Sequence, residues 1–228
     1  MSTANTDTQE NPNSLTRGRV IVGATLLGLA VLMAIIMSID FHLEERRGIP
    51  HADMPACERP ESTDTGYSGT LPVEAWDRVG YAYVPKTPFG PSRETDDAPT
   101  CYEHSPAGAV TAGVYVATLG SAGQTNTVLT HMSVDSPNTD RFLETVGTDE
   151  AVPSAVPEPE GLRLNNYTGD TANVSVVLLT HAGYRVVDID LVWDDGDWKW
   201  NPPSESLSVT TVNTLTGYNK IEEAPTNG

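Results

Sequence analysis

The 228-residue sequence has few positive charges: Lys and Arg number 13, against 31 Asp and Glu. The resulting net charge of −18 argues against nucleic-acid binding, which needs clustered Lys and Arg to neutralise phosphates. The same shortage disfavours docking on an anionic lipid surface. An acidic composition of this kind is typical of an exposed domain that repulsion keeps soluble. We therefore expect no nucleic-acid partner.

The sequence also lacks the usual patterns of catalytic and metal sites. It contains no GxSxG turn, P-loop, GxGxxG or HExxH pattern, and no Cys/His spacing typical of zinc. The aspartates between residues 188 and 197 match no calcium-binding loop, and we interpret them as a solvated strand face and a hairpin turn. A hydrolase or isomerase would need His104, His131 or His181 to converge with a carboxylate in a cleft. We expect a non-enzymatic protein without metal or cofactor.

One long apolar run is present, because the twenty residues from Val20 to Ile39 carry no charge. As a helix this run spans about 30 Å, the thickness of the hydrocarbon core of a bilayer. Arg17 and Arg19 precede it, which favours a cytoplasmic N-terminus. The alternative is a cleaved signal peptide, whose apolar stretch is shorter, at about 7 to 15 residues. We predict a disordered tail at residues 1–18 and a retained transmembrane helix at residues 19–39.

Only two cysteines occur, Cys57 and Cys101, and both follow the apolar run. In an oxidising compartment such a pair is typical of a disulfide, which would stabilise the fold by about 4 kcal/mol on the chain-entropy model. A redox pair or a metal site is the alternative, although the spacing is not CxxC. Residues 40–72, rich in Pro, Ser, Thr and acidic residues, are predicted to form a stalk, and a bridge from Cys57 would fasten its end to the domain.

A helix start is clear within residues 73–203, the predicted domain. Ser105 suits the N-cap, Pro106 the first helical position and Gly120 the C-terminal stop. The body of this helix is rich in small side chains, which allow close packing on a sheet. Shorter helices are expected at residues 125–134 and 139–146, after a strand at 76–84 and an irregular loop at 84–103.

Two hairpin turns predict the register of the strands that follow. A turn at Ala182-Gly183 would pair Val187 with Leu178 and Ile189 with Val176. The Asp195-Gly196 dipeptide, a strong signal for a two-residue turn, would pair Trp193 with Trp198 and Leu191 with Trp200. Both turns place their large apolar residues on one face of the sheet. The predicted core comprises Val176, Leu178, Ile189, Leu191, Trp193, Trp198 and Trp200.

Helices followed by antiparallel strands predict an α+β roll, with the helices on the face that carries the tryptophans. A further strand is expected at residues 162–167. Residues 204–228 are predicted to be a C-terminal extension with an edge strand at 207–215.

Several short motifs resemble those of extracytoplasmic proteins of actinobacterial conjugative and other mobile elements. They are Trp76, Gly80, Val84-Pro85, Gly90-Pro91, the segment from His104 to Val110, and the Val192-Trp-Asp-Asp-Gly-Asp-Trp198 run. The resemblance covers residues 74–203. It implies a cystatin-like, nuclear-transport-factor-like roll similar to the TcpC-type bitopic components of type IV secretion machines. The disulfide is a departure from that group.

Those components have a short cytoplasmic tail, one membrane helix and an outer roll, and the resemblance transfers no catalytic residue. It implies a membrane-anchored assembly or scaffold protein of a conjugation or type IV secretion-like envelope complex, which contacts other envelope proteins or itself. The N-terminus would be cytoplasmic and the C-terminal domain extracytoplasmic. The alternative is an envelope module that binds a small ligand or peptide in a pocket beside Trp193 and Trp198.

Overall fold

The computed structural model describes Cys57 and residues 66–94, 98–146 and 156–221. All of them belong to one compact unit, Pro55–Gly228. Its fold is α+β, with antiparallel sheets and three helices among the described residues. The predicted tail, the apolar run from Val20 to Ile39 and most of the stalk lie outside these residues. No helix in the described part of the chain has the length and hydropathy to cross a bilayer.

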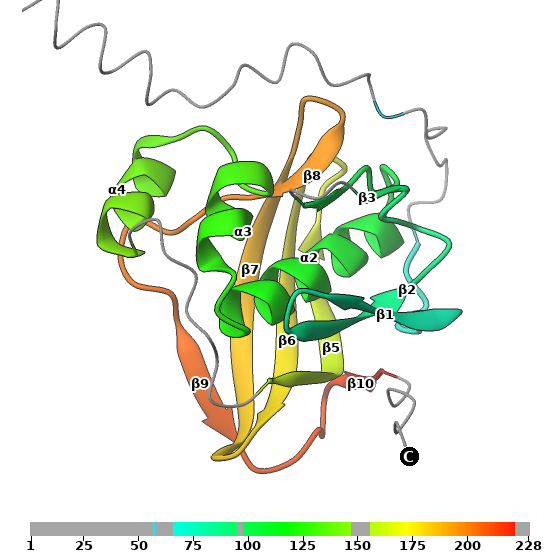
Figure 1. Ribbon diagram of the computed structural model, residues 1–228. Helices are drawn as coiled ribbons and strands as arrows, with labels where there is room; N and C mark the ends of the chain where they lie inside the picture. Colours follow the sequence, from blue (N-terminus) through cyan, green and yellow to red (C-terminus); the bar gives the residue numbers. More distant parts are fainter. Residues whose placement is uncertain (1–56, 58–65, 95–97, 147–155, 222–228) are drawn as a thin grey trace, which may run out of the picture. The chain divides into compact units, whose positions relative to one another are not determined.

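The main sheet is antiparallel and has the strand order β10-β5-β6-β7-β8, with β9 also beside β7 (Figure 1). Strand β7 is the longest, and two strands share one of its edges: β9 pairs with residues 184–187 and β8 with residues 191–194. The sheet strands are β5 (Glu158–Tyr167), β6 (Thr171–Thr180), β7 (Gly183–Asp194), β8 (Asp197–Trp200), β9 (Val209–Val212) and β10 (Asn219–Lys220).

Among the described residues ahead of the sheet, the chain forms three helices: α2 (Pro106–Ser121), α3 (Thr125–His131) and α4 (Pro137–Val146). Helix α2 lies on the apolar face of the sheet (Figure 1), and a Cβ at Gly113 would be 3.1 Å from the Cβ of Val174. The small side chains of α2 therefore allow the close contact expected from the sequence. The helix does not stop at Gly120 as predicted, because Gly123 instead takes the positive φ, of 87°.

The segment before α2 contains four short strands. β1 (Ala75–Val79) and β2 (Ala82–Lys86) form a hairpin where a single strand was predicted, because the chain turns at Gly80, whose φ is 56°. β3 (Arg93–Glu94) and β4 (Pro99–Thr100) pair within the predicted irregular loop. Gly80 also lies against the side chain of Gln124, since a Cβ there would approach it to 2.5 Å.

The two large hairpins differ in how well the sequence predicted them. The β7–β8 register is the predicted one, with Trp193 opposite Trp198 and Leu191 opposite Trp200. The β6–β7 register is shifted by two residues, so that Val187 lies opposite Val176 rather than Leu178. The shift arises because Gly183, with a φ of 91°, begins β7 instead of lying in the turn. A shift of two keeps every side chain on its predicted face.

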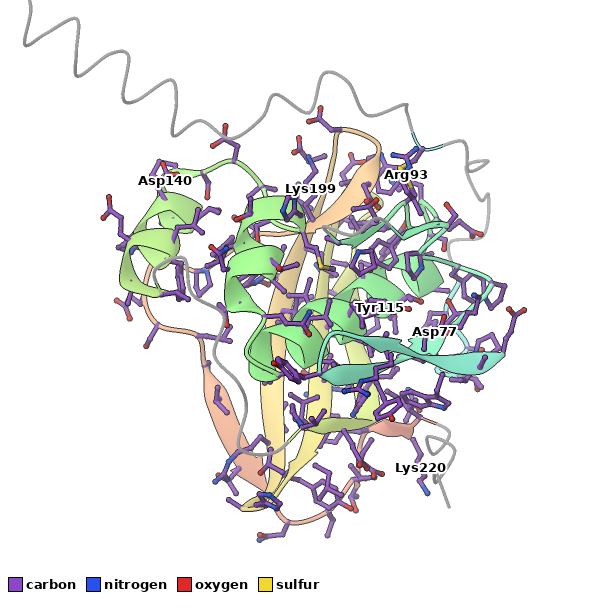
Figure 2. The ribbon with its side chains drawn as sticks, viewed as in Figure 1. Asp77, Arg93, Tyr115, Asp140, Lys199 and Lys220 are labelled. Atoms are coloured by element: carbon purple, nitrogen blue, oxygen red, sulfur yellow. A yellow bond between two sulfur atoms is a disulfide. The ribbon has the colours of Figure 1, made fainter. Side chains whose placement is uncertain are left out.

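The predicted core residues lie on the inner face of the sheet. Six of the seven are buried, and Trp193 is half-buried. Tyr115 of α2 is also fully buried (Figure 2), and its ring packs edge-on against that of Tyr102. The sheet also continues past residue 203, where the sequence analysis placed the end of the domain: β9 and β10 belong to it, and Ile221 is 1% exposed.

Candidate functional site

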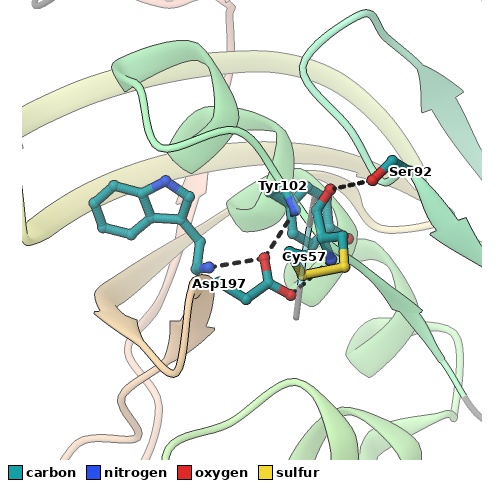
Figure 3. The surroundings of a disulfide bond; sticks show 6 residues. Cys57, Ser92, Tyr102 and Asp197 are labelled. Carbon is teal, nitrogen blue, oxygen red and sulfur yellow. Dashed lines mark hydrogen bonds between the residues drawn. A yellow bond between two sulfur atoms is a disulfide. The ribbon is translucent and has the colours of Figure 1, made fainter. Parts of the chain in front are cut away.

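The predicted disulfide joins Cys57 to Cys101, with 5.3 Å between the Cα atoms. Cys101 has a φ of 70°, a conformation that residues other than glycine rarely adopt. Its backbone N–H donates to Oδ2 of Asp197 at 2.7 Å, and the N–H of Tyr102 donates to Oδ1 at 2.8 Å (Figure 3). The N–H of Trp198 also donates to Oδ1, at 2.9 Å. One carboxylate thus ties the disulfide-bearing loop to the β7–β8 hairpin.

Asp197 is nearly buried, at 8% exposure. Burial raises the pKa of its carboxyl above the ordinary range, while the three backbone N–H donors and the charge of Lys199 oppose this rise. Lys199 itself bonds to Asp194 and Asp195, at 2.9 and 3.3 Å. Both oxygens of Asp197 are engaged by backbone donors, so this carboxylate acts as a structural tie.

Trp198 extends this tie to the start of α2. Its indole Nε1 donates to the carbonyl oxygen of Glu103 at 3.0 Å. A Cβ at Gly108 would lie 1.9 Å from that same oxygen, so only glycine leaves room for it. Ser105 caps the helix by accepting a bond from the N–H of Gly108 at 3.0 Å, as predicted. We call the disulfide, Asp197, Trp198 and the backbone of residues 101–103 the cysteine–tryptophan clamp.

His104 lies at the edge of the clamp. Its ring stacks on Trp193, with 4.0 Å between centroids and 8° between planes. Its Nε2 is 3.0 Å from the carbonyl oxygen of Gly169 and 3.7 Å from Oδ1 of Asp170. This stacking covers one face of the Trp193 ring, which is half-buried.

The three histidines singled out in the sequence do not converge. His104 bonds to the turn before β6, whereas His181 is exposed in the turn after it. A strand of ten residues separates these turns, which corresponds to about 30 Å. His131 ends α3. Within the described residues, no group of three or more His, Cys, Asp and Glu side chains is placed to hold a metal ion.

Asp188 and Asp190 lie on the outer face of the sheet, as the sequence indicated. Asp188 accepts a hydrogen bond from Ser175 at 2.5 Å, and Asp190 accepts one from Asn173 at 2.6 Å. The positive φ values of Asp195 and Gly196, 51° and 76°, form the β7–β8 turn. These aspartates therefore belong to a solvated face and a turn.

A cavity of about 180 Å³ opens at the other end of β7. The alternative function, a binding module, would be favoured by a pocket beside Trp193 and Trp198, but Trp198 is only 1% exposed and this cavity lies elsewhere. It lies between the end of α2, the β6–β7 hairpin and the segment that enters β9. We call it the edge pocket. Its lining residues are Ser121, Pro157, Leu178, Thr180, Arg185, Val187, Leu207 and Val209.

Arg185 is the one charged residue among those that line the edge pocket. Its Nη1 donates to Oγ1 of Thr211 on β9. None of the ion pairs found in the described part of the chain involves Arg185. Arg185 therefore borders the pocket with an exposed guanidinium, which has more donors than this single hydrogen bond uses.

Comparison with known proteins gives one match. A family model described as a domain of unknown function, DUF8175, matches residues 45–220. This range includes every strand and helix described above, the clamp and the edge pocket. No curated protein and no solved structure matches the chain.

Proposed function

The chain belongs to the DUF8175 family, and from its own residues we propose that it is a non-enzymatic, membrane-anchored assembly component of a cell-envelope complex. Residues 19–39 would hold it in the bilayer with a cytoplasmic N-terminus. The domain after residue 55 would then make protein contacts outside the cytoplasm, within a conjugation or type IV secretion-like machine.

The observation that carries this proposal is the disulfide between Cys57 and Cys101. Disulfides persist in oxidising compartments and are rare in the cytosol. The bond is also part of the fold, since Asp197 binds the backbone N–H of Cys101 and of Tyr102. A domain that relies on such a bond belongs outside the cytoplasm, which agrees with an apolar run placed before it.

The assembly role is supported by how the polar groups of the domain are used. Asp197 and Trp198 bind backbone groups within the protein, and the histidines are dispersed. The packing of helices on one face of an antiparallel sheet agrees with a nuclear-transport-factor-like roll. The motifs that resemble those of extracytoplasmic proteins of conjugative elements favour a role in protein contacts over a chemical reaction.

The location is tested by the redox state of the cysteines in cells. Free thiols are alkylated with a heavy maleimide before and after reduction, and the mass shift is read on a gel. The full chain should react only after reduction. A matched variant that lacks residues 20–39 stays in the cytosol, and its thiols should react with the maleimide before any reduction. Free thiols in the full chain would contradict the proposal.

The assembly role is tested by crosslinking in intact membranes. The full chain should be trapped in adducts with itself or with other envelope proteins. Removal of residues 66–228 should abolish these adducts while leaving the apolar run in place. Recovery of the full chain only as a monomer, at crosslinker doses that trap a known envelope complex, would count against the proposal.

The edge pocket favours a second candidate function, a module that binds a small apolar ligand. A cavity of this size takes a group as large as benzene. Toluene should therefore raise the thermal midpoint of the full chain, because a ligand that binds only the folded state stabilises it. Val187→Phe, which fills the pocket, should remove the rise. An equal rise in both proteins would reject this candidate.

A further inference from the structure

Strand β9 presents an edge that no strand of the described residues covers. It pairs with β7 on one side, and Val209 is 54% exposed. Exposed edges are commonly protected by charged side chains, proline or a bulge. Residues 206–219 contain no Asp, Glu, Lys, Arg or Pro, in a chain with a net charge of −18. This stretch is therefore an uncharged, β-branched edge on an otherwise acidic protein.

The edge pocket lies directly beside this edge. Val209 of β9 and Leu207, just before it, form one wall, while Leu178 and Val187 of the sheet contribute apolar surface. Its volume of about 180 Å³ is close to that of cavities that hold one benzene-sized group. The pocket thus has the size of a single large apolar side chain.

Arg185 adds a positive charge to the same place. Arg185 lines the pocket, and its guanidinium, at an exposed position, is bonded to Thr211 of β9. Arginine forms paired hydrogen bonds with carboxylates, which strengthen when partly shielded from water. A ligand here would therefore gain from carrying a carboxylate next to its apolar group.

We infer that β9 and the edge pocket bind the C-terminal segment of another polypeptide, one that ends in an aliphatic residue. The segment adds to the sheet as a strand along β9 through backbone hydrogen bonds. Its last side chain enters the pocket, and its terminal carboxylate is bound by Arg185. This inference rests on the proposed assembly function and adds the chemistry of the partner. Pairing of two β9 edges with each other would leave both the cavity and Arg185 unused.

The test uses two short peptides and the full chain in a mild detergent. Both peptides have the sequence Thr-Val-Thr-Val-Leu and a fluorophore at the N-terminus, and they differ only in a free or an amidated C-terminus. Fluorescence anisotropy gives the two dissociation constants. The free acid should bind about tenfold to a hundredfold more tightly than the amide, as expected for hydrogen bonds to a charged group.

Matched variants assign this preference to the site. Arg185→Gln should bring the affinities for acid and amide to the same value. Arg163→Gln, on the exposed face of β5 where the guanidinium lies over Tyr218, should leave their ratio unchanged. Val187→Phe should weaken both peptides by filling the pocket. A circular dichroism melt of each variant checks that it remains folded.

Three outcomes would overturn the inference. The first is that the native chain binds the acid and the amide with equal affinity. The second is that Arg185→Gln leaves the ratio of these two affinities unchanged. The third is that the chain binds neither peptide and instead dimerises through β9. Each leaves the proposed function standing if the disulfide forms in cells and crosslinked adducts persist. Loss of those adducts together with free thiols would instead reject the proposed function.

Discussion

The inner face of the sheet is filled in opposite ways at the two ends of β7. At residues 191–194, where β8 pairs, Trp198 is buried and its indole N–H is bonded, and Asp197 binds three backbone N–H groups. At residues 184–187, where β9 pairs, a cavity remains and the strand edge carries no charge. The two ends of β7 therefore differ in packing, and we propose that the first end provides stability while the second binds a partner.

This separation means that changes at the clamp should alter stability, while changes at the edge pocket should alter binding alone. Free energies of unfolding are compared by urea titration of the full chain.

Trp198→Ala should cost about 5 kcal/mol, the upper end of the range for truncating a buried aromatic residue. The substitution also leaves the Glu103 carbonyl without its indole donor. Trp193→Ala should cost clearly less, because that ring is half-buried. Equal losses in the two variants would show that burial at the clamp is not what distinguishes them.

Replacing both cysteines, Cys57→Ser with Cys101→Ser, should lower stability by about 4 kcal/mol, since 44 residues of sequence separate the bridged positions. Adding reductant to the native chain should reproduce this loss and should leave the double variant unchanged. A loss below about 1 kcal/mol would mean that Asp197 alone holds the loop, contrary to the entropic account.

Gly108→Ala should cost about 3 kcal/mol, because the added methyl group would meet the Glu103 carbonyl oxygen. Gly120→Ala is the matched control in the same helix, where a Cβ meets nothing within 4 Å. That control should gain about 0.5 to 1 kcal/mol from the better helix propensity of alanine. Similar effects at both positions would contradict the close approach of Glu103.

Asp197→Asn should cost about 2 kcal/mol at neutral pH, since its amide nitrogen cannot accept a bond from a backbone N–H. In the native chain the raised pKa of Asp197 means that the folded state holds this proton more tightly than the unfolded chain. Protonation of Asp197 therefore stabilises the folded state. This stabilisation is complete at a pH below the pKa of the unfolded chain, and it is lost as the pH rises through the pKa of the folded state.

The stability gap between the native chain and Asp197→Asn should therefore narrow as the pH rises out of the acid range. If the difference in stability instead widens with rising pH, the pKa of Asp197 is lowered in the folded state and not raised.

Val209→Asp should change stability by less than about 0.5 kcal/mol, because the side chain is largely exposed. It should nevertheless abolish binding of the free-acid peptide, since it places a negative charge at the pocket. Thr168→Asp, at an exposed site of the β5–β6 turn, should affect neither quantity. A large loss of stability in Val209→Asp would mean that the two ends of β7 are not separate.

The elements with local signals were predictable from sequence. The two-residue turn between β7 and β8 needs two successive residues with positive φ, and Asp195-Gly196 is a dipeptide that commonly adopts this geometry. The β7–β8 register was therefore predicted residue by residue. Ser105 and Pro106 likewise set the start of α2. Gly183 was less informative, because a glycine with positive φ also suits the position after a turn, and the predicted register was displaced by two residues.

The clamp and the edge pocket depend on contacts that no local pattern reveals. Asp197 and Cys101 are 96 residues apart in the sequence, and Asp197 was interpreted with its neighbours as part of a solvated turn. The edge pocket joins the end of α2 to Leu207 and Val209, in a segment predicted to lie outside the domain. The edge strand predicted at residues 207–215, which contains β9, was the sequence signal for one wall of this pocket.

The disulfide also decides how the domain carries mechanical load. Tension on the chain ahead of Cys57 crosses directly into Cys101 and bypasses residues 58–100, which lie inside the covalent loop. The β1–β2 hairpin is thereby relieved of force, and the pull is transmitted through the backbone of residues 101 and 102 to Asp197 on the β7–β8 hairpin. A pull applied ahead of Cys57 is thus borne by the β7–β8 hairpin, in which Trp198 is buried.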